Sequence, residues 1–366
     1  MTNAAENAVA VRGLAKNYGA VAALRSLDLD IGSGDYFVLL GPSGGGKTTL
    51  LRLIGGFIRP SNGRILIHGQ DVTDLPPNRR PTSMVFQGFA LFPHMTVAGN
   101  VGYGLRLRKL PKAEIRDRVS AMLELVGLGG YADRMPHELS GGQQQRVQLA
   151  RSLILDVDIL LLDEPLAALD ANLRKDMCIE LKRLQEKVGI TFIHVTHNQE
   201  EAMTVADNLA IISAGELVES GRAIDLYETP KHRFTADFFG ENNILDGRVA
   251  AVDGDTVSVD VGFGTIPVAR QDAKVTVGDA VSVSIRSERT IIIDGRAADD
   301  PAITTLPATY QDTVYLGLTT SDLALLADGT EIVARRLSGN GDRAQSLRGA
   351  SITIGWHYAD AKLQAT

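Results

Sequence analysis

A glycine-rich stretch, GPSGGGKTT at 41–49, places the strongest constraint on the fold of this chain. The apolar run DYFVLL at 35–40 precedes it and predicts a buried strand, whereas TLLRLIGGF at 49–57 has apolar residues at helical spacing. The local order is therefore strand, glycine loop, helix. In such a loop successive backbone N–H groups can point inward at the helix N-terminus and surround phosphate oxygens.

The stretch matches the pattern G-x-x-x-x-G-K-[ST] of a phosphate-binding P-loop, and a glycine-rich turn formed by chance is the alternative. Its place between a strand and a helix favours the P-loop. In a P-loop the Lys47 ammonium reaches the β- and γ-phosphates, and the Thr48 hydroxyl coordinates Mg²⁺. The candidate nucleotide-binding residues of the loop are Gly41, Pro42, Ser43, Gly44, Gly45, Gly46, Lys47, Thr48 and Thr49.

A second apolar strand, ILLLDEP at 159–165, ends in two adjacent carboxylates. A P-loop fold needs an aspartate at this place to hold Mg²⁺, and Asp163 fits that role. Glu164 comes one residue later, where it can polarise an attacking water. An acid that ends a buried strand is often only a helix cap, so the upstream P-loop is what makes both residues functional candidates.

Apolar strands and helices alternate through the N-terminal part of the chain. ITFIHVTH at 190–197 is a continuous apolar run, typical of a strand buried on both faces of a parallel sheet. Helical spacing dominates from about 89 to 155, where Gly127 can stop one helix. This order predicts an α/β domain at 1–239, with a P-loop NTPase core and a helical subdomain.

The composition changes near Phe239. DGRVAAVDGDTVSVDVG at 246–262 and ASITIGWHY at 350–358 alternate apolar and polar residues, and Asp-Gly or Gly-Asp turns separate such runs. This pattern predicts a second, all-β domain at 240–366, which has the look of a small OB-like barrel made of two related β units in tandem.

Size and charge exclude several classes of protein. A chain of 366 residues has room for two domains, and its single cysteine, Cys178, has no partner for an intrachain disulfide. The net charge of −7 argues against a general nucleic-acid binder. Neither a signal peptide nor a run of about 20 apolar residues is evident, so we expect a soluble protein whose membrane role depends on a partner.

The segment LSGGQQQR at 139–146 resembles the family signature of ATP-binding cassette (ABC) transporters. Other elements match that family in the expected order. Gln87 resembles the Q-loop glutamine, Asp170 the D-loop aspartate and His197 the switch histidine, while Tyr18 falls where an aromatic residue stacks on adenine. The resemblance extends into the C-terminal part, which is similar to the regulatory (TOBE-like) domain of the family's importers.

The resemblance implies that Mg²⁺ and ATP bind between two ATPase subunits. It assigns Glu164, His197 and Gln87 to catalysis, and Thr48, Gln87 and Asp163 to Mg²⁺. Asp170 would lie at the dimer interface. The signature residues that would grip the γ-phosphate bound to the partner subunit are Ser140, Gly141, Gly142 and Gln143. The ATPase pair is a homodimer or a pair with a close relative.

The resemblance also implies two transmembrane permease subunits, a substrate-binding protein as an indirect partner, and a place on the cytoplasmic face of the bacterial inner membrane. Phe89 and Phe92, just after Gln87, are either permease contacts or core residues. The chain looks most similar to polyamine (spermidine/putrescine) importer ATPases, with iron(III), sulfate, phosphonate and sugar importers as alternatives.

Two positions depart from the family pattern. Gly45 stands where many relatives have cysteine, and we expect no harm from it. Asn198 stands where aspartate usually follows the switch histidine, so it removes a charge beside His197. Soluble non-transport ATPases are the distant alternative, but DNA-repair types need a long coiled coil and translation-associated types carry two cassettes, and the chain shows neither.

Overall fold

The computed structural model describes residues 7–88, 90–270, 273–293, 300, 302–339 and 348–365. The chain divides into two compact units, Met1–Ala223 and Ile224–Thr366, so the division lies before the 239/240 boundary that the sequence suggests. Within the residues described, no helix combines the length and the apolar character needed to cross a bilayer.

A six-stranded sheet with the order β10-β9-β3-β8-β7-β6 forms the centre of the first unit. Every residue of β3, β7 and β8 is buried, which explains why these segments are apolar without alternation. All neighbouring pairs from β9 to β6 are parallel, and β10 pairs antiparallel with β9. The strands are β3 (Tyr36–Leu40), β6 (Thr82–Val85), β7 (Ile159–Asp163), β8 (Thr191–Val195), β9 (Asn208–Ser213) and β10 (Glu216–Arg222).

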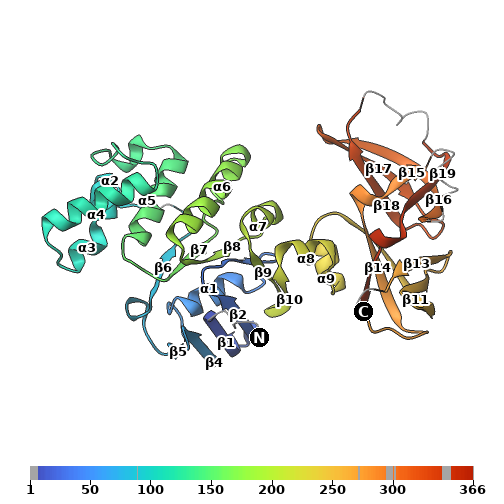
Figure 1. Ribbon diagram of the computed structural model, residues 1–366, viewed down its shortest axis with the longest axis horizontal. Helices are drawn as coiled ribbons and strands as arrows, with labels where there is room; N and C mark the ends of the chain where they lie inside the picture. Colours follow the sequence, from blue (N-terminus) through green and yellow to red (C-terminus); the bar gives the residue numbers. More distant parts are fainter. Residues whose placement is uncertain are drawn as a thin grey trace. The chain divides into compact units, whose positions relative to one another are not determined.

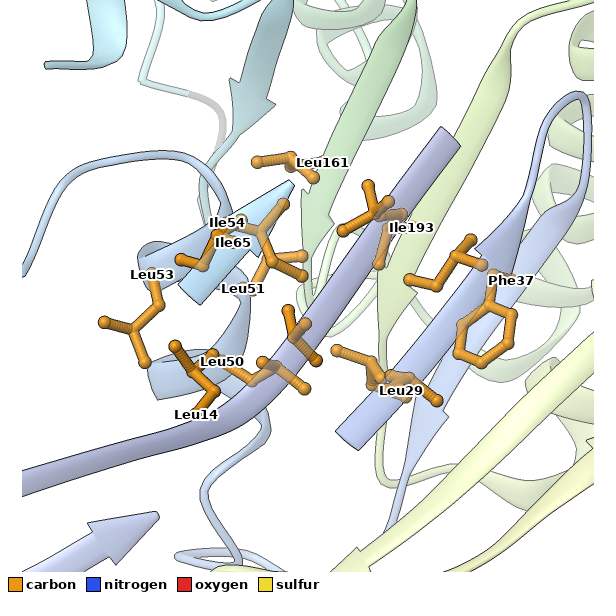
Figure 2. Close-up of a cluster of buried hydrophobic side chains, with 14 of the residues drawn as sticks. Leu14, Leu29, Phe37, Leu50, Leu51, Leu53, Ile54, Ile65, Leu161 and Ile193 are labelled. Carbon is orange, nitrogen blue, oxygen red and sulfur yellow. The ribbon is translucent and has the colours of Figure 1, made fainter. Parts of the chain in front are cut away.

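An antiparallel sheet of order β2-β1-β4-β5 completes this unit. Its strands are β1 (Asn7–Tyr18), β2 (Val21–Gly32), β4 (Asn62–Ile67) and β5 (Gln70–Asp71). Helix α1 (Lys47–Ile54) follows β3 and shares one hydrophobic core with strands of both sheets. Figure 2 shows Leu50 and Leu51 of α1 gathered with Leu14 of β1 and Leu161 of β7. The packing of this core fixes the position of α1, and therefore also the position of the glycine-rich loop that leads into its first turn.

Helices fill the segment between β6 and β7 and lie together at one end of the unit (Figure 1). They are α2 (Val97–Val101), α3 (Tyr103–Leu107), α4 (Lys112–Leu125) and α5 (Gly141–Leu153). They have a hydrophobic core of their own, which includes Val101, Leu123 and Val147. Two more helices follow, α6 (Ala171–Val188) between β7 and β8, and α7 (Gln199–Val205) between β8 and β9. The expected α/β core with a helical insertion is confirmed.

The second unit begins at Ile224, within α8 (Ala223–Glu228), and continues with α9 (Arg233–Phe238); the sequence assigned both helices to the first domain. The Arg286 guanidinium explains the difference, because it donates hydrogen bonds to the carbonyl oxygens of Tyr227 and Phe239. It also lies 3.8 Å from the centre of the Tyr227 ring. Contacts of this kind join the two short helices to the β-rich part of the chain.

The rest of the second unit is all β, as expected, in two five-stranded sheets. The first has the order β13-β12-β11-β14-β20, with β11 (Asn242–Asp253), β12 (Thr256–Asp260), β13 (Thr265–Ala269), β14 (Ala280–Arg286) and β20 (Lys362–Ala365). The second has the order β15-β19-β16-β17-β18, with β15 (Ile291–Ile293), β16 (Ile303–Tyr315), β17 (Thr319–Leu325), β18 (Glu331–Leu337) and β19 (Ser351–His357).

These two sheets are not independent units in tandem. The last strand, β20, returns to the first sheet and pairs with β14. One hydrophobic core includes Val283 and Leu363 of the first sheet together with Leu306 and Trp356 of the second. The two sheets follow one another in the chain, as expected, except that β20 returns to the first sheet and that both sheets share one core.

Candidate functional site

Five of the predicted site elements, namely the glycine-rich loop, Gln87, Asp163, Glu164 and His197, lie at one edge of the six-stranded sheet. Strands β3, β8, β7 and β6 are neighbours and run parallel, so their carboxyl ends lie at the same edge. The glycine-rich loop follows β3, and His197 follows β8. Strand β7 ends at Asp163, and Glu164 is the next residue. Gln87 comes shortly after the end of β6. Ligands of open α/β sheets bind outside such an edge.

Lys47 lies folded back across the glycine-rich loop. Its Nζ donates hydrogen bonds to the carbonyl oxygens of Gly41 and Pro42, each at 2.8 Å, and the residue is 4 % exposed. Burial lowers the pKa of Lys47, while the nearby charges of Glu164 and Asp163 act in the opposite direction. The Lys47 ammonium group lies at the N-terminus of α1, where a helix favours anions, so it can bind a phosphate group there.

The loop lies against β9 so closely that glycine is required at two positions. Gly41 has φ 148°, and a Cβ there would lie 2.0 Å from the carbonyl oxygen of Ile212. A Cβ at Gly45 would lie 2.8 Å from the same oxygen. With glycine at 45 the loop therefore approaches β9 more closely than any side chain would permit, so Gly45 belongs to the packing of this particular loop.

Thr48 and Asp163 form the oxygen-rich side of the site. Thr48 Oγ1 donates a hydrogen bond of 2.9 Å to Asp163 Oδ1, and Arg52 Nη2 lies 3.6 Å from the other carboxylate oxygen. Burial raises the pKa of Asp163, which is 4 % exposed. Hydroxyl and carboxylate oxygens are the ligands Mg²⁺ prefers, so the donor set fits this ion. Among the described residues no group of three or more His, Cys, Asp and Glu could hold a metal by itself.

Glu164 lies at the centre of the predicted catalytic residues. Its φ of 46° is unusual for a residue with a side chain, and its N–H donates to the carbonyl oxygen of Val195 at 3.1 Å. Gln87 Nε2 donates to Glu164 Oε2 at 3.3 Å, and His197 Nδ1 lies 3.6 Å from Glu164 Oε1. The strained backbone thus directs the carboxylate between Gln87 and His197.

Side chains that belong to no recognised motif hold the segment around Gln87. Gln148 of α5 is 1 % exposed, and its Nε2 donates to the carbonyl oxygens of Phe86 and Gly88 at 3.1 and 3.2 Å. Arg151 of the same helix donates to the carbonyl oxygen of Ala90 at 2.9 Å. A polar residue on the buried face of a predicted helix was the available signal for Gln148.

The structure describes only one of the two phenylalanines predicted as permease contacts or core residues. Phe89 lies outside the described residues. Phe92 is half-buried; its ring centre lies 4.6 Å from that of Tyr103, and the Arg151 guanidinium lies 5.3 Å from it. Phe92 thus contacts the helical subdomain, and its proposed contact with a permease stays a prediction.

The signature residues form the start of α5. Ser140 is its N-cap and is exposed; its Oγ accepts from the Gln143 N–H at 3.4 Å, and Gln143 Oε1 accepts from the Ser140 N–H at 3.0 Å. This reciprocal cap leaves the hydroxyl proton of Ser140 available to an acceptor outside the chain. In the described part of the chain no hydrogen bond joins the signature to the glycine-rich loop.

Asp170 and Asn198 each cap a helix, whereas Tyr18 lies at the end of a strand. Asp170 caps α6 by accepting from the Leu173 N–H at 3.0 Å, and Asn198 caps α7 by accepting from the Glu201 N–H at 3.1 Å. An amide oxygen caps a helix as well as a carboxylate does, so Asn198 keeps this local function. Tyr18, at the end of β1, is 52 % exposed, which leaves its ring accessible.

Comparison with known proteins accounts for this arrangement. The model of the family "ABC transporter" matches residues 24–167, and that of the TOBE domain matches residues 283–363. The chain is 43 % identical, over the full length of both, to a protein named spermidine/putrescine import ATP-binding protein PotA of Roseobacter denitrificans. It is also 43 % identical to the protein of that name from Thermobifida fusca, over 97 % of this chain and 93 % of the relative.

Solved structures resemble the first part of the chain. CbiO1 from Clostridium perfringens, part of the ABC transporter complex cbiONQ, is 31 % identical with a TM-score of 0.58 and covers 61 % of this chain and 91 % of its own. The ATP-binding cassette MJ0796, in a dimeric post-hydrolysis state bound to ADP and Pi, is 31 % identical with a TM-score of 0.53 and covers 59 % and 98 %. The chain therefore belongs to the ABC transporter family, as an ATP-hydrolysing, ATP-binding protein with a C-terminal TOBE domain.

Proposed function

We propose that this chain is the ATPase subunit of a bacterial polyamine importer, with spermidine or putrescine as cargo. The observation that carries the proposal is the 43 % identity, over the whole of both chains, to a relative named a spermidine/putrescine import ATP-binding protein. In this role the chain binds two permease subunits at the cytoplasmic face of the inner membrane and receives cargo indirectly from a substrate-binding protein.

Each site residue has a role in phosphoryl transfer to water. Backbone N–H groups of the glycine-rich loop bind the phosphates, and the Lys47 ammonium offsets the charge that develops on the transferred group. Thr48, Asp163 and Gln87 are the residues that would hold Mg²⁺, which supplies further neutralisation of phosphate charge when it is bound. The exposed ring of Tyr18 offers a face on which adenine can stack.

Glu164 acts as the general base. Its carboxylate orients the attacking water and accepts the water proton, while Gln87 donates a hydrogen bond to one carboxylate oxygen and His197 lies near the other. His197 can in addition donate a hydrogen bond to the γ-phosphate, which would connect the base with the group that is transferred. Positioning and electrostatics thus supply most of the rate acceleration.

A second copy of the chain completes each site. The exposed Ser140 hydroxyl and the N–H groups at the start of α5 suit a γ-phosphate that is bound to the other copy. Asp170 would lie at the contact between the two copies. Closure of this dimer upon ATP binding would then be transmitted to the permeases through the segment around Gln87.

Uptake of labelled polyamine tests this function. In a strain that lacks the chain, the wild-type gene should restore ATP-dependent uptake of spermidine or putrescine, and the Lys47→Ala gene should not. Restored uptake of iron(III), sulfate, phosphonate or sugar, with no change in polyamine uptake, would contradict the proposed polyamine cargo but not the proposed role as an ATPase subunit. Normal polyamine uptake with Lys47→Ala would contradict the proposed cargo and the proposed ATPase role.

A further inference from the structure

Glu201, a buried carboxylate, lies directly behind the switch histidine and has no role in the steps described above. The residue is 6 % exposed, and its Oε2 accepts a 2.6 Å hydrogen bond from the hydroxyl of Thr196, the residue before His197. The hydroxyl of Thr196 also accepts from the N–H of Asn198 at 3.0 Å. The backbone on both sides of His197 is therefore held through one hydroxyl that Glu201 orients.

Arg174 connects the same carboxylate to the D-loop. It lies in the first turn of α6, and its Nη2 donates to the carbonyl oxygen of Leu169, next to Asp170, at 2.8 Å. Its Nε lies 3.4 Å from Glu201 Oε1, so the two groups form an ion pair, although Nε has no hydrogen-bond partner among the described residues. One guanidinium thus contacts both the D-loop backbone and the carboxylate behind His197.

Open space flanks this ion pair. A cavity of about 50 Å³ lies towards the catalytic residues and is lined by Glu164, Ala167, Arg174, Thr196, His197 and Glu201. A second cavity, of about 340 Å³, also has Arg174 and Glu201 in its lining, together with Cys178 and Asn198. Both cavities have Arg174 and Glu201 in their lining, so unfilled space lies beside the pair.

We propose that Arg174 and Glu201 are positioning residues that connect the D-loop to His197, so that a shift of the D-loop also shifts the switch histidine. The proposal rests on the proposed function, in which a second copy of the chain contacts the D-loop. When that copy moves Leu169 and Asp170, the Arg174 guanidinium moves with them. Glu201 follows, and it carries Thr196 and the adjoining peptide of His197.

The electrostatics of the pair favour such coupling. Burial raises the pKa of Glu201, whereas the Thr196 hydroxyl and the Arg174 guanidinium act in the opposite direction, so both partners favour the charged carboxylate. His194 on β8 also faces Glu201, but it cannot serve as a cationic partner in place of Arg174, because complete burial lowers the pKa of His194 to about 3 and leaves it neutral. Separation of this carboxylate from its guanidinium partner would therefore cost free energy.

Full-length variants can test the link. Arg174→Met and Glu201→Gln should each lower kcat for ATP hydrolysis at least fivefold, with the Kd for Mg²⁺-ATP changed by less than twofold. The double variant leaves no unpaired buried charge, and its kcat should lie within twofold of the slower single variant. Lys182→Met is the matched control, because Lys182 lies on the same helix and pairs with Asp207 at 2.7 Å; its kcat should stay within twofold of wild type.

A second readout does not depend on turnover. In protein with labelled histidines, the NMR signal of His197 should move in Arg174→Met and in Glu201→Gln, whereas that of His68 should not, since His68 faces Asp158 instead. An unmoved His197 signal, unchanged kcat in folded variants, or single-variant effects that multiply in the double variant would overturn the link. Wild-type turnover in Lys47→Ala would instead contradict the proposed function, and the NMR comparison would still decide the link.

Discussion

Gln87 Nε2 donates a 3.3 Å hydrogen bond to Glu164 Oε2, although 77 positions separate the two residues in the chain. The contact forms because β6 and β7 are parallel neighbours, so the residues that follow them meet at one edge of the sheet. The Q-loop glutamine and the proposed general base therefore form one unit, and a change in the position of the Q-loop alters the surroundings of the base.

Glu164→Gln should keep ATP binding and lower kcat at least about 100-fold, because an amide preserves the shape of the side chain but cannot accept the water proton. Dimers should accumulate in gel filtration with ATP and Mg²⁺, since ATP is bound and not consumed. Calorimetry measures the binding. Intact binding with only monomers, or turnover within a few-fold of wild type, would contradict the assignment of Glu164.

Lys47→Ala should lower kcat by about 100-fold or more, because it removes the cation nearest the transferred phosphoryl group. Steady-state phosphate release measures the effect. Lys187→Ala, an exposed lysine at the end of α6, is the control and should hydrolyse ATP at the wild-type rate. Similar turnover in the two variants would show that the glycine-rich loop is not the nucleotide site.

Gln148→Leu should lower kcat several-fold with little change in ATP affinity. The substitution removes both hydrogen bonds to the carbonyl oxygens that flank Gln87, so the Q-loop loses its fixed position against α5. Gln145→Leu is the matched control, because Gln145 is equally buried on the same helix and its Nε2 has no hydrogen-bond partner among the residues that the structure describes. Equal effects of the two substitutions would argue for general disturbance of α5.

The stability of the first unit should depend on pH through His194. Burial lowers the pKa of His194 from 6.5 to about 3, so between these values the unfolded chain binds a proton that the folded chain does not. The folded state therefore loses up to about 1.4 kcal/mol per pH unit as the pH falls below the unfolded pKa. His194→Asn should remove this contribution, and its melting temperature should fall less than that of wild type between pH 7 and pH 5.

Two groups that face His194 bear on the same experiment. Tyr36 donates to or accepts from His194 Nδ1 at 3.1 Å, and Glu201 Oε2 lies 3.8 Å from Nε2. The raised pKa of Glu201 acts in the opposite direction, because its stabilising effect is lost as the pH rises. Both groups are present in the variant, so the difference between the two proteins reports on the imidazole of His194 together with its contacts to them. Parallel melting curves would contradict the assignment of a neutral, buried histidine.

Chains that end at residue 223 and at residue 239 should both bind ATP with an affinity within tenfold of the full chain, or about 1.4 kcal/mol. Every proposed nucleotide-binding residue lies upstream of both ends. The longer chain should be cleaved rapidly by proteases after 223, because its last helices have lost the hydrogen bonds from Arg286. Resistance of 224–239 to proteolysis would place these helices with the first unit instead.

The sequence alone determines the chemistry that the cassette needs. Gly41 to Thr49, the acids Asp163 and Glu164 and the signature that begins at Ser140 are each recognised from residues close together in the chain. Loop, cap and strand-end motifs depend on local backbone geometry, so a short stretch is enough to specify them. The α/β class and the all-β C-terminal part follow from hydrophobic periodicity in the same way.

Only the tertiary structure decides which distant residues support those motifs. Gln148, Arg174 and Glu201 form contacts that depend on how α5, α6 and α7 pack against the sheet, and each is an ordinary polar residue in its own segment. The need for glycine at 45 likewise arises from the carbonyl oxygen of Ile212 on a neighbouring strand. The return of β20 to its sheet also depends on pairing with β14, far earlier in the chain. Such contacts have no local pattern, because their energies arise from burial and pairing that exist only once the chain is packed.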